Sequence, residues 1–229
     1  MSSVLTDRPD TRRSRTFLGV AAVAGLSVLT LGMGASAANA ATFTAGHTDI
    51  VSVSCDSGAL TIDTYREDGG HIPPSQIGTH SFLYDDSAAP AAAITYSSGA
   101  YRVSSNEIYE EDIPFIGFQY ASATGSGCPA SISVDVLKAS GTNSGNASIT
   151  GEANPDGTAT GSTSSANTST SRVTVWKPGT AGKLSHVHGE WTFQGPQSGA
   201  DFTLGFNVYK AGSTAVQGSI SPVKIRVQP

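Results

Sequence analysis

Residues 184–193 read Leu-Ser-His-Val-His-Gly-Glu-Trp-Thr-Phe, and their alternation is typical of a β-strand. Side chains two residues apart lie on the same face of a strand, so His186, His188 and Glu190 are predicted to share one face. The opposite face would carry Val187, Trp191 and Phe193, which suit a core. The polar face can converge on a metal ion, because imidazole binds zinc and copper. A solvated polar row without a metal is the alternative, since strands alternate by default.

The same period-two alternation recurs along the chain after residue 41. It is clearest at residues 60–64, 132–136, 173–175, 202–208 and 223–227. Turn-forming stretches lie between these segments, at residues 68–70, 73–74, 97–99 and 177–179. No sustained helical pattern interrupts them. The sequence therefore predicts an all-β fold, an antiparallel β-sandwich of immunoglobulin-like or jelly-roll-like type, built as a single domain.

Residues 140–171 differ from the rest because Ile149 is their only large apolar residue among Ser, Thr, Gly, Asn and Ala. Such a composition is compatible with a flexible linker. It is also compatible with an excursion that carries strands near residues 146–150 and 158–162. We favour an exposed insertion, because the strands on both sides of it are needed for one sheet.

The first forty residues have the organisation of a signal peptide. Four arginines precede an apolar segment at residues 17–33, and small-residue cleavage motifs follow at residues 35–37 and 38–40. We expect cleavage near Ala40, by Sec or twin-arginine export, which leaves residues 41–229 as the mature domain. The apolar segment is just long enough to span a bilayer, but its glycines and alanines favour cleavage. No apolar tail or sorting motif follows the last strand, so we expect a secreted or surface-associated protein without a transmembrane span.

Charge and cysteine content narrow the function classes. The protein has a formal net charge of -5, and the first forty residues carry four arginines and two aspartates, so residues 41–229 carry -7. An acidic surface argues against nucleic-acid binding, which needs clustered Lys and Arg. Cys55 and Cys128 are the two cysteines, and an even count in an exported chain predicts one disulfide. Two free buried thiols are the alternative.

Three short motifs occur in a fixed order along the predicted mature chain. They are G-H-x-D-I at residues 46–50, P-[FY]-[IL]-G at residues 114–117 and H-x-H-x-x-W-x-F at residues 186–193. This ordered trio resembles the actinobacterial surface-anchored protein domain, also called the choice-of-anchor M domain, over nearly the whole mature chain. The resemblance implies an exported β-rich domain of the cell envelope. It also implies an envelope protein or an ABC transporter component as a partner, because members are often encoded beside metal-type transporters. The chain departs from the family at residues 108–112 and shows no C-terminal anchor.

Together the spacing and the resemblance define a candidate metal site. Its ligands are predicted to be His47, His186 and His188, which can meet if their strands are neighbours. Asp49 shares a strand face with His47 and is either a fourth ligand or an acceptor that fixes an imidazole, while Glu190 is the reserve ligand. Zinc or copper suits such a set. A structural hydrogen bond is the alternative role for His47, and two further histidines in loops, His71 and His80, are expected to be solvated.

Three function classes remain open. The first is a non-catalytic exported binding module, associated with metal uptake, whose histidines cluster within a few ångströms. The second is a structural or adhesive surface protein without a metal, with scattered histidines and a broad apolar patch. The third is a cupin-like metalloenzyme, although Glu190 follows the histidines too closely for the usual acidic ligand. We expect no catalytic residues, since the mature chain lacks G-x-S-x-G and its paired carboxylates lie in acidic loops.

Overall fold

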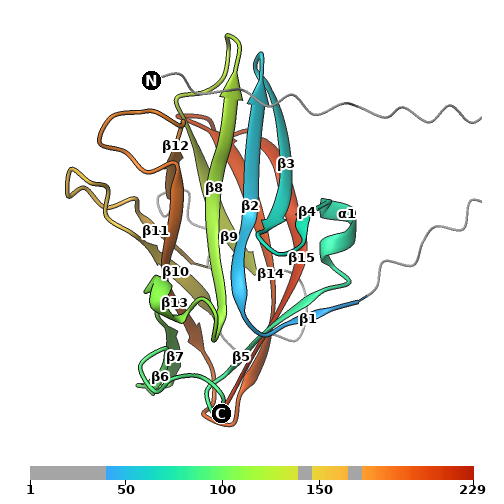
Figure 1. The fold of residues 1–229 in the computed structure, drawn as a ribbon, viewed down its shortest axis with the longest axis vertical. Coiled ribbons are helices and arrows are strands. Elements are labelled where there is room, and N and C mark those ends of the chain that lie inside the picture. The colour runs from blue at the N-terminus through green and yellow to red at the C-terminus, as the bar shows by residue number, and fades with distance from the viewer. Residues whose placement is uncertain (1–39, 139–145, 165–171) are drawn as a thin grey trace, which may run out of the picture. The chain divides into compact units, whose positions relative to one another are not determined.

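The computed structural model describes residues 40–138, 146–164 and 172–229, which form two β-sheets packed on one hydrophobic core (Figure 1). The predicted all-β sandwich is confirmed. The predicted signal peptide, apart from Ala40, lies outside the described residues. In the part of the chain that is described, no helix has the length and hydropathy needed to cross a membrane.

One sheet has six strands, in the order β1-β5-β15-β14-β9-β12. These strands are β1 (Thr42–Phe43), β5 (Ser81–Asp85), β15 (Val216–Gln228), β14 (Ala200–Lys210), β9 (Ser131–Lys138) and β12 (Val173–Trp176). Its longest pairing joins β14 to β15 in antiparallel register. This sheet supplies the half of the core that faces the second sheet.

The second sheet has nine strands, of which seven follow the order β11-β10-β13-β8-β2-β3-β4. They are β11 (Ser162–Ser164), β10 (Ala147–Gly151), β13 (His186–Gln194), β8 (Pro114–Thr124), β2 (Gly46–Asp56), β3 (Ala59–Arg66) and β4 (Gly70–Ile72). A hairpin of β6 (Ile94–Ser97) and β7 (Ala100–Val103) extends it through pairing of β7 with β13. The loops carry a short helix, α1 (Pro74–Ile77), and a 3-10 turn, η1 (Glu107–Tyr109).

Pairing within the described sheets is mixed, which refines the expectation of an antiparallel sandwich. Strand β2 runs parallel to β8, and β5 runs parallel to both β1 and β15. Parallel neighbours need a long connection rather than a hairpin. Between β2 and β8 that connection is residues 57–113, which contain β3 to β7. The remaining strand pairs are antiparallel.

Aromatic rings join the two sheets across the core. Phe118 of β8 and Trp191 of β13 both contact Phe206 of β14, with ring centroids 5.9 and 6.3 Å apart in edge-on arrangements. Such contacts add to the gain from apolar burial. Because Val187 and Trp191 fill the core, the odd-numbered face of β13 points inward, as its alternation predicts.

The predicted insertion at residues 140–171 is only partly an excursion. Strand β10 pairs with β13, and its Ala147 and Ile149 are buried in the core, so the expectation of an exposed insertion is wrong for this strand. Two apolar residues at positions i and i+2 are enough to give a short strand a buried face. Residues 139–145 and 165–171 of this segment lie outside the described part.

The predicted disulfide is present between Cys55 and Cys128, whose Cα atoms are 5.9 Å apart. It ties the end of β2 to the segment between β8 and β9. The bond closes a loop of 73 residues, which corresponds to about 4 kcal/mol of stabilisation in the chain-entropy picture. It therefore secures the end of the sheet that lies away from the histidines.

Candidate metal centre

Three adjacent strands build the candidate site on the outer face of the nine-stranded sheet. Strand β8 lies in the middle, with β2 parallel on one side and β13 antiparallel on the other. Asp49 of β2 and His188 of β13 are both in register with Gly117 of β8. Two segments separated by about 140 residues in sequence are thereby brought to one place on the sheet.

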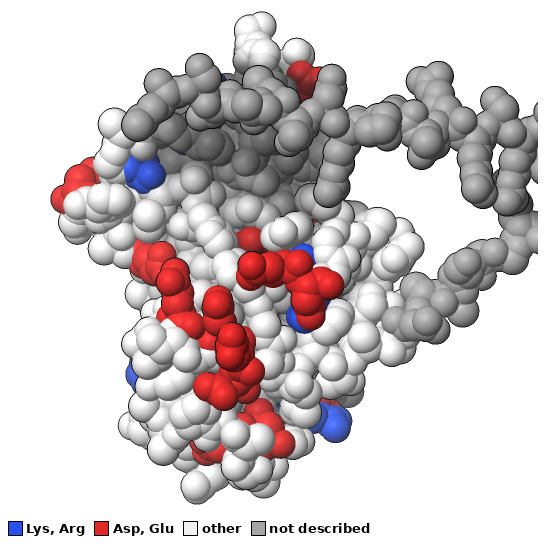
Figure 2. Space-filling model, viewed as in Figure 1, with Lys and Arg blue, Asp and Glu red and all other residues white. Residues whose placement is uncertain are grey.

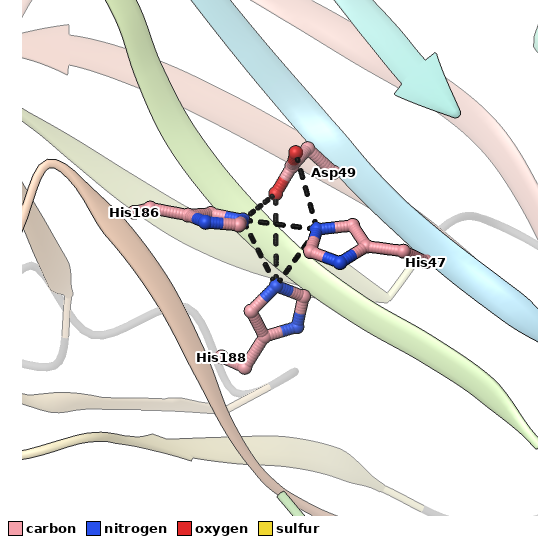
Figure 3. Close-up of side chains that lie close together, drawn as sticks. All are labelled: His47, Asp49, His186 and His188. Carbon is pink, nitrogen blue, oxygen red and sulfur yellow. Dashed lines mark hydrogen bonds and ion pairs between the residues drawn. The ribbon is translucent and has the colours of Figure 1, made fainter. Parts of the chain in front are cut away.

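Four side chains converge there, as Figure 3 shows. The Nε2 atom of His188 lies 3.0 Å from Nε2 of His186 and 3.2 Å from Nε2 of His47. The Nε2 atoms of His47 and His186 are 3.1 Å apart. Oδ1 of Asp49 lies 2.7 Å from Nε2 of His186 and 3.8 Å from Nε2 of His188, and Oδ2 lies 3.6 Å from Nε2 of His47.

These separations fit a tetrahedral metal ion. Zinc–ligand bonds of about 2.0–2.1 Å place the corners of a tetrahedron roughly 3.3 Å apart. The three nitrogen–nitrogen distances of 3.0–3.2 Å are close to that value. The distances of 2.7 and 3.8 Å from Oδ1 of Asp49 to Nε2 of His186 and His188 bracket it. Each Nε2 also meets two others of its own kind, and the three pairs cannot all be satisfied by protons on imidazole rings. A cation held at their common centre would satisfy all three lone pairs.

Gly117 leaves the space in which the rings meet. A Cβ atom at this position would lie 2.5 Å from Cε1 of His188, 2.6 Å from its Nδ1 and 2.6 Å from the carbonyl oxygen of Val187. Such contacts are far inside van der Waals distance. The absence of a side chain on the central strand therefore allows ligands from both neighbouring strands to approach each other.

A β-bulge in β2 follows the ligands of that strand. The register of β2 shifts between Asp49 and Val51 against β8, and between Asp49 and Ser52 against β3. Bulges bend a strand and redirect its side chains. Here the shift lets His47 and Asp49 face the site while Ile50 and Val51 are both fully buried.

His188 is the most enclosed of the three imidazoles. Its ring stacks on Phe115, with centroids 4.1 Å apart and planes 16° apart, and only 4 % of the residue is exposed. Burial, reinforced by the nearby His186, lowers the pKa of His188 to about 3, so this ring is neutral at physiological pH. A neutral imidazole is the form that binds a metal.

Asp49 supplies the negative charge of the site. Burial alone would raise its pKa, but hydrogen bonds from His186 and His47 outweigh that effect and lower it. The hydrogen bond to Asp49 likewise raises the pKa of His47 against the opposing effect of burial, with help from Glu110 and Glu67. The carboxylate is thus ionised and held against the imidazoles, as a ligand for a cation must be.

The site opens toward solvent at His186, whose side chain is 43 % exposed. On the His47 side, a depression of about 330 Å³ is lined by Gly46, His47 and the acidic residues Glu67, Asp68, Glu110 and Glu111. Figure 2 shows acidic side chains gathered across the face that Figure 1 presents. A small cation can therefore reach the ligands through surroundings of favourable charge.

The four ligands predicted from sequence lie together, but the reserve ligand Glu190 does not join them. Glu190 accepts a hydrogen bond of 2.8 Å from Nη1 of Arg102 on β7 and is largely exposed. Beyond residue 188, β13 pairs with β10 and β7 instead of β8. Glu190 therefore lies beside residues of β10 and β7, away from the histidine cluster. The expectation that it belongs to the site is not supported by its position.

The two remaining histidines differ from each other. His71 is exposed and contacts Asp63, with Nδ1 2.7 Å from the carboxylate. His80 is not fully solvated as expected, because its ring stacks on Phe43 with centroids 5.1 Å apart and burial lowers its pKa. Neither histidine lies in the metal cluster.

Sequence reasoning did not place Phe115, Gly117 or Glu110 beside the histidine cluster. The first two belong to the quoted P-[FY]-[IL]-G motif at residues 114–117, which marked the segment but not its contact with the histidines. Only the parallel pairing of β8 with β2 shows that this motif forms the floor of the site.

No family model matches the chain, and no curated protein matches it in sequence. Among solved structures, the N-terminal domain of PorA aligns with a TM-score of 0.30 and 13 % identity, over 77 % of this chain and 95 % of that chain. An alignment with so low a TM-score carries no weight for fold or function. The functional reading therefore depends on the geometry of the site.

Proposed function

We propose that this protein is an exported, non-catalytic domain that binds a transition metal ion through His47, Asp49, His186 and His188. The observation that carries this proposal is the convergence of three imidazole nitrogens and one carboxylate oxygen on one point. The nearly equal nitrogen–nitrogen spacings support a coordinating role over a chance cluster of polar side chains.

Zinc is the first candidate ion and copper the second. The donor set is three nitrogens and one oxygen, without the thiolate or thioether that Cu(I) favours. Cu(II) prefers a square-planar or tetragonal arrangement, whereas zinc accepts a tetrahedron readily. The geometry therefore favours Zn²⁺, although copper binds most nitrogen ligands more tightly.

The number of protein ligands favours binding over catalysis. Catalytic zinc sites usually have three protein ligands and keep a fourth position for water or substrate. In the proposed site, four protein ligands would occupy all four positions of a tetrahedron. A cupin-like enzyme also needs its ligands inside a barrel, whereas these lie on the outer face of a sheet.

A role in metal uptake at the cell envelope is part of the same proposal. It is supported by the predicted signal peptide, by the disulfide, which suits an oxidising compartment, and by the resemblance to the choice-of-anchor M domain. An envelope protein or an ABC transporter component is the proposed partner. Direct association with such a component in a pull-down with the zinc-loaded domain would test this part separately.

A structural or adhesive surface protein is the competing proposal. It predicts a broad exposed apolar patch, yet the large apolar side chains exposed among the described residues are Ile108 and Val216, which lie on different elements. The histidines are also clustered instead of scattered. Both observations favour the metal-binding domain.

The decisive experiment measures metal by mass spectrometry in the purified mature domain, before and after reloading with zinc. We expect near-stoichiometric zinc in the wild-type protein and its loss in the His186→Ala, His188→Ala double variant. His71→Ala is the matched control, because it removes a histidine that lies outside the cluster. Absence of metal from the reloaded wild-type protein would refute the proposed function.

A further inference from the structure

This inference rests on the proposed metal binding. It concerns the Nδ1 atoms of the three histidines, which are the ring nitrogens that face away from the metal position. An imidazole that binds a metal through Nε2 carries its proton on Nδ1. In metal sites that N–H usually donates to a carboxylate, a carbonyl or water, which fixes the orientation of the ring. The atoms around each Nδ1 therefore show which group fixes the orientation of each imidazole ring.

The three Nδ1 atoms have different surroundings. That of His188 is buried without a fully formed hydrogen bond, and its ring is instead held by stacking on Phe115. His186 is exposed, so its outer nitrogen is available to solvent. Nδ1 of His47 faces a carboxylate, with Oε2 of Glu110 at 3.6 Å. Among the three clustered histidines of the described structure, His47 alone has a carboxylate oxygen within 4.0 Å of its Nδ1 atom. Glu152 acts on His186 only at longer range.

The backbone holds Glu110 in this position. Its carbonyl oxygen accepts a hydrogen bond of 2.7 Å from the backbone N–H of Gly46, the residue that precedes His47. Its own N–H donates to the carbonyl oxygen of Glu107, the first residue of η1, at 3.1 Å. Gly46 has a φ of +94°, a left-handed conformation that glycine adopts most easily. These backbone hydrogen bonds therefore fix the Glu110 side chain beside His47.

We propose that Glu110 is a positioning residue that accepts the Nδ1 proton of His47 and so keeps its Nε2 atom aimed at the metal. The separation of 3.6 Å is slightly longer than a direct hydrogen bond. A small rotation of the glutamate side chain closes it. The carboxylate also adds negative charge close to the cation without coordinating it.

A general effect of charge is the rival explanation. Glu67, Asp68 and Glu111 line the same depression as Glu110, and any of them would attract a cation over a distance comparable to the Debye length. Glu111 offers a matched comparison, because it is the adjacent residue, carries the same charge and has no contact with the histidine ring among the described interactions. If Glu110 positions His47, its removal weakens zinc binding more than removal of Glu111. If only charge matters, the two removals have similar effects.

The test compares Glu110→Ala with Glu111→Ala in the full mature domain. Zinc affinity is measured by competition with a chromophoric chelator at low and high salt, and the unfolding midpoint of the metal-free proteins checks the fold. We expect Glu110→Ala to weaken zinc binding by about 10- to 100-fold at both salt concentrations. Glu111→Ala should have a much smaller effect that disappears at high salt.

A second measurement reports the ring itself. Long-range ¹H–¹⁵N NMR spectra of the zinc-loaded protein distinguish the two nitrogens of His47, and we expect the resonance of Nδ1 to move in Glu110→Ala but not in Glu111→Ala. Equal losses of affinity in both variants, or an unchanged affinity in Glu110→Ala, would overturn the positioning role. Failure of the wild-type protein to take up zinc would instead overturn the proposed function, so the two failures can be told apart.

Discussion

At the scale of single residues, Gly117 decides whether the ligands of two strands can meet. The position lacks a side chain where any Cβ would lie within 2.6 Å of the His188 ring. A substitution here must displace either the ring or the strand. The site thus depends on the lack of a Cβ atom at Gly117 as well as on its four polar side chains.

We predict that Gly117→Ala weakens zinc binding and destabilises the domain. Overpacking of this kind costs about 1–3 kcal/mol, and the displaced His188 ring leaves a distorted ligand set. Urea unfolding and chelator competition measure the two effects. Gly69→Ala is the control, because a Cβ there meets only an ordinary contact at 3.9 Å. Wild-type affinity in Gly117→Ala would show that the ring can move without loss of the site.

A second residue-scale prediction concerns the charge of Asp49. Asp49→Asn keeps the size of the buried side chain but removes the negative charge that offsets a divalent ion. We expect zinc affinity to fall by more than tenfold, while the three histidines retain weak binding. Isothermal titration calorimetry measures the change. If Asn at this position bound zinc as tightly as Asp, the carboxylate would not be a ligand.

At this scale the sequence predicted that His47, Asp49, His186 and His188 lie together, but not the residues that support them. The spacing of two residues placed His186 with His188 and His47 with Asp49, because side-chain direction along a strand follows a fixed period. The same logic failed for Glu190, since β13 changes its neighbour beyond residue 188. Phe115 and Glu110 could not be assigned from spacing, because their contacts depend on how distant segments pair.

At the scale of elements, β2 carries two separate features at its two ends. His47 and Asp49 lie near its start, and Cys55 forms the disulfide near its end. Eight residues of extended strand separate His47 from Cys55, a distance of about 25 Å. The histidine–aspartate cluster and the disulfide therefore lie at opposite ends of one strand.

We predict that the Cys55→Ser, Cys128→Ser double variant is less stable by about 4 kcal/mol, from the closed loop of 73 residues. The zinc affinity of its folded form should remain close to that of the wild type, because the site lies at the other end of β2. Urea unfolding measures the loss of stability. Chelator competition, carried out without urea on the folded variant, measures the zinc affinity. A large loss of affinity in a fully folded variant would contradict this separation.

The strands themselves were predictable from alternation, whereas the parallel pairings were not. Buried faces with a period of two identify most of the segments that form strands. Parallel pairing of β2 with β8 requires residues 57–113 to form the crossover, and alternation contains no information about partners so distant in sequence. Strand β10 was expected to be exposed, because its apolar face consists only of Ala147 and Ile149, yet both side chains are buried.

At the scale of the whole molecule, the proposed metal site joins a segment near the start of the described chain to one that follows it by about 140 residues. Ligands at residues 47 and 49 are separated from those at residues 186 and 188 by most of the fold. An ion that binds both segments binds only the folded chain, since the unfolded chain does not hold the four ligands together. Metal binding at the proposed site would therefore be coupled to global stability.

We predict that zinc raises the free energy of unfolding of the wild-type domain. At free zinc 100 times above Kd, the gain is about 2.7 kcal/mol, and an excess of chelator should reverse it. Differential scanning calorimetry across a zinc series measures the shift. The His186→Ala, His188→Ala variant should show no shift, and an equal shift in that variant would mean that zinc stabilises the protein elsewhere.

The central position of β8 has a consequence for how the sheet assembles. A slip of one residue between β8 and either neighbour turns every side chain of the slipped strand to the other face. Such a slip would send Asp49 or His188 into the core and leave no place for an ion. An ion bound at the proposed site would therefore report that three strands have found their correct alignment, and the metal-to-protein ratio of a preparation would give the fraction of properly assembled molecules.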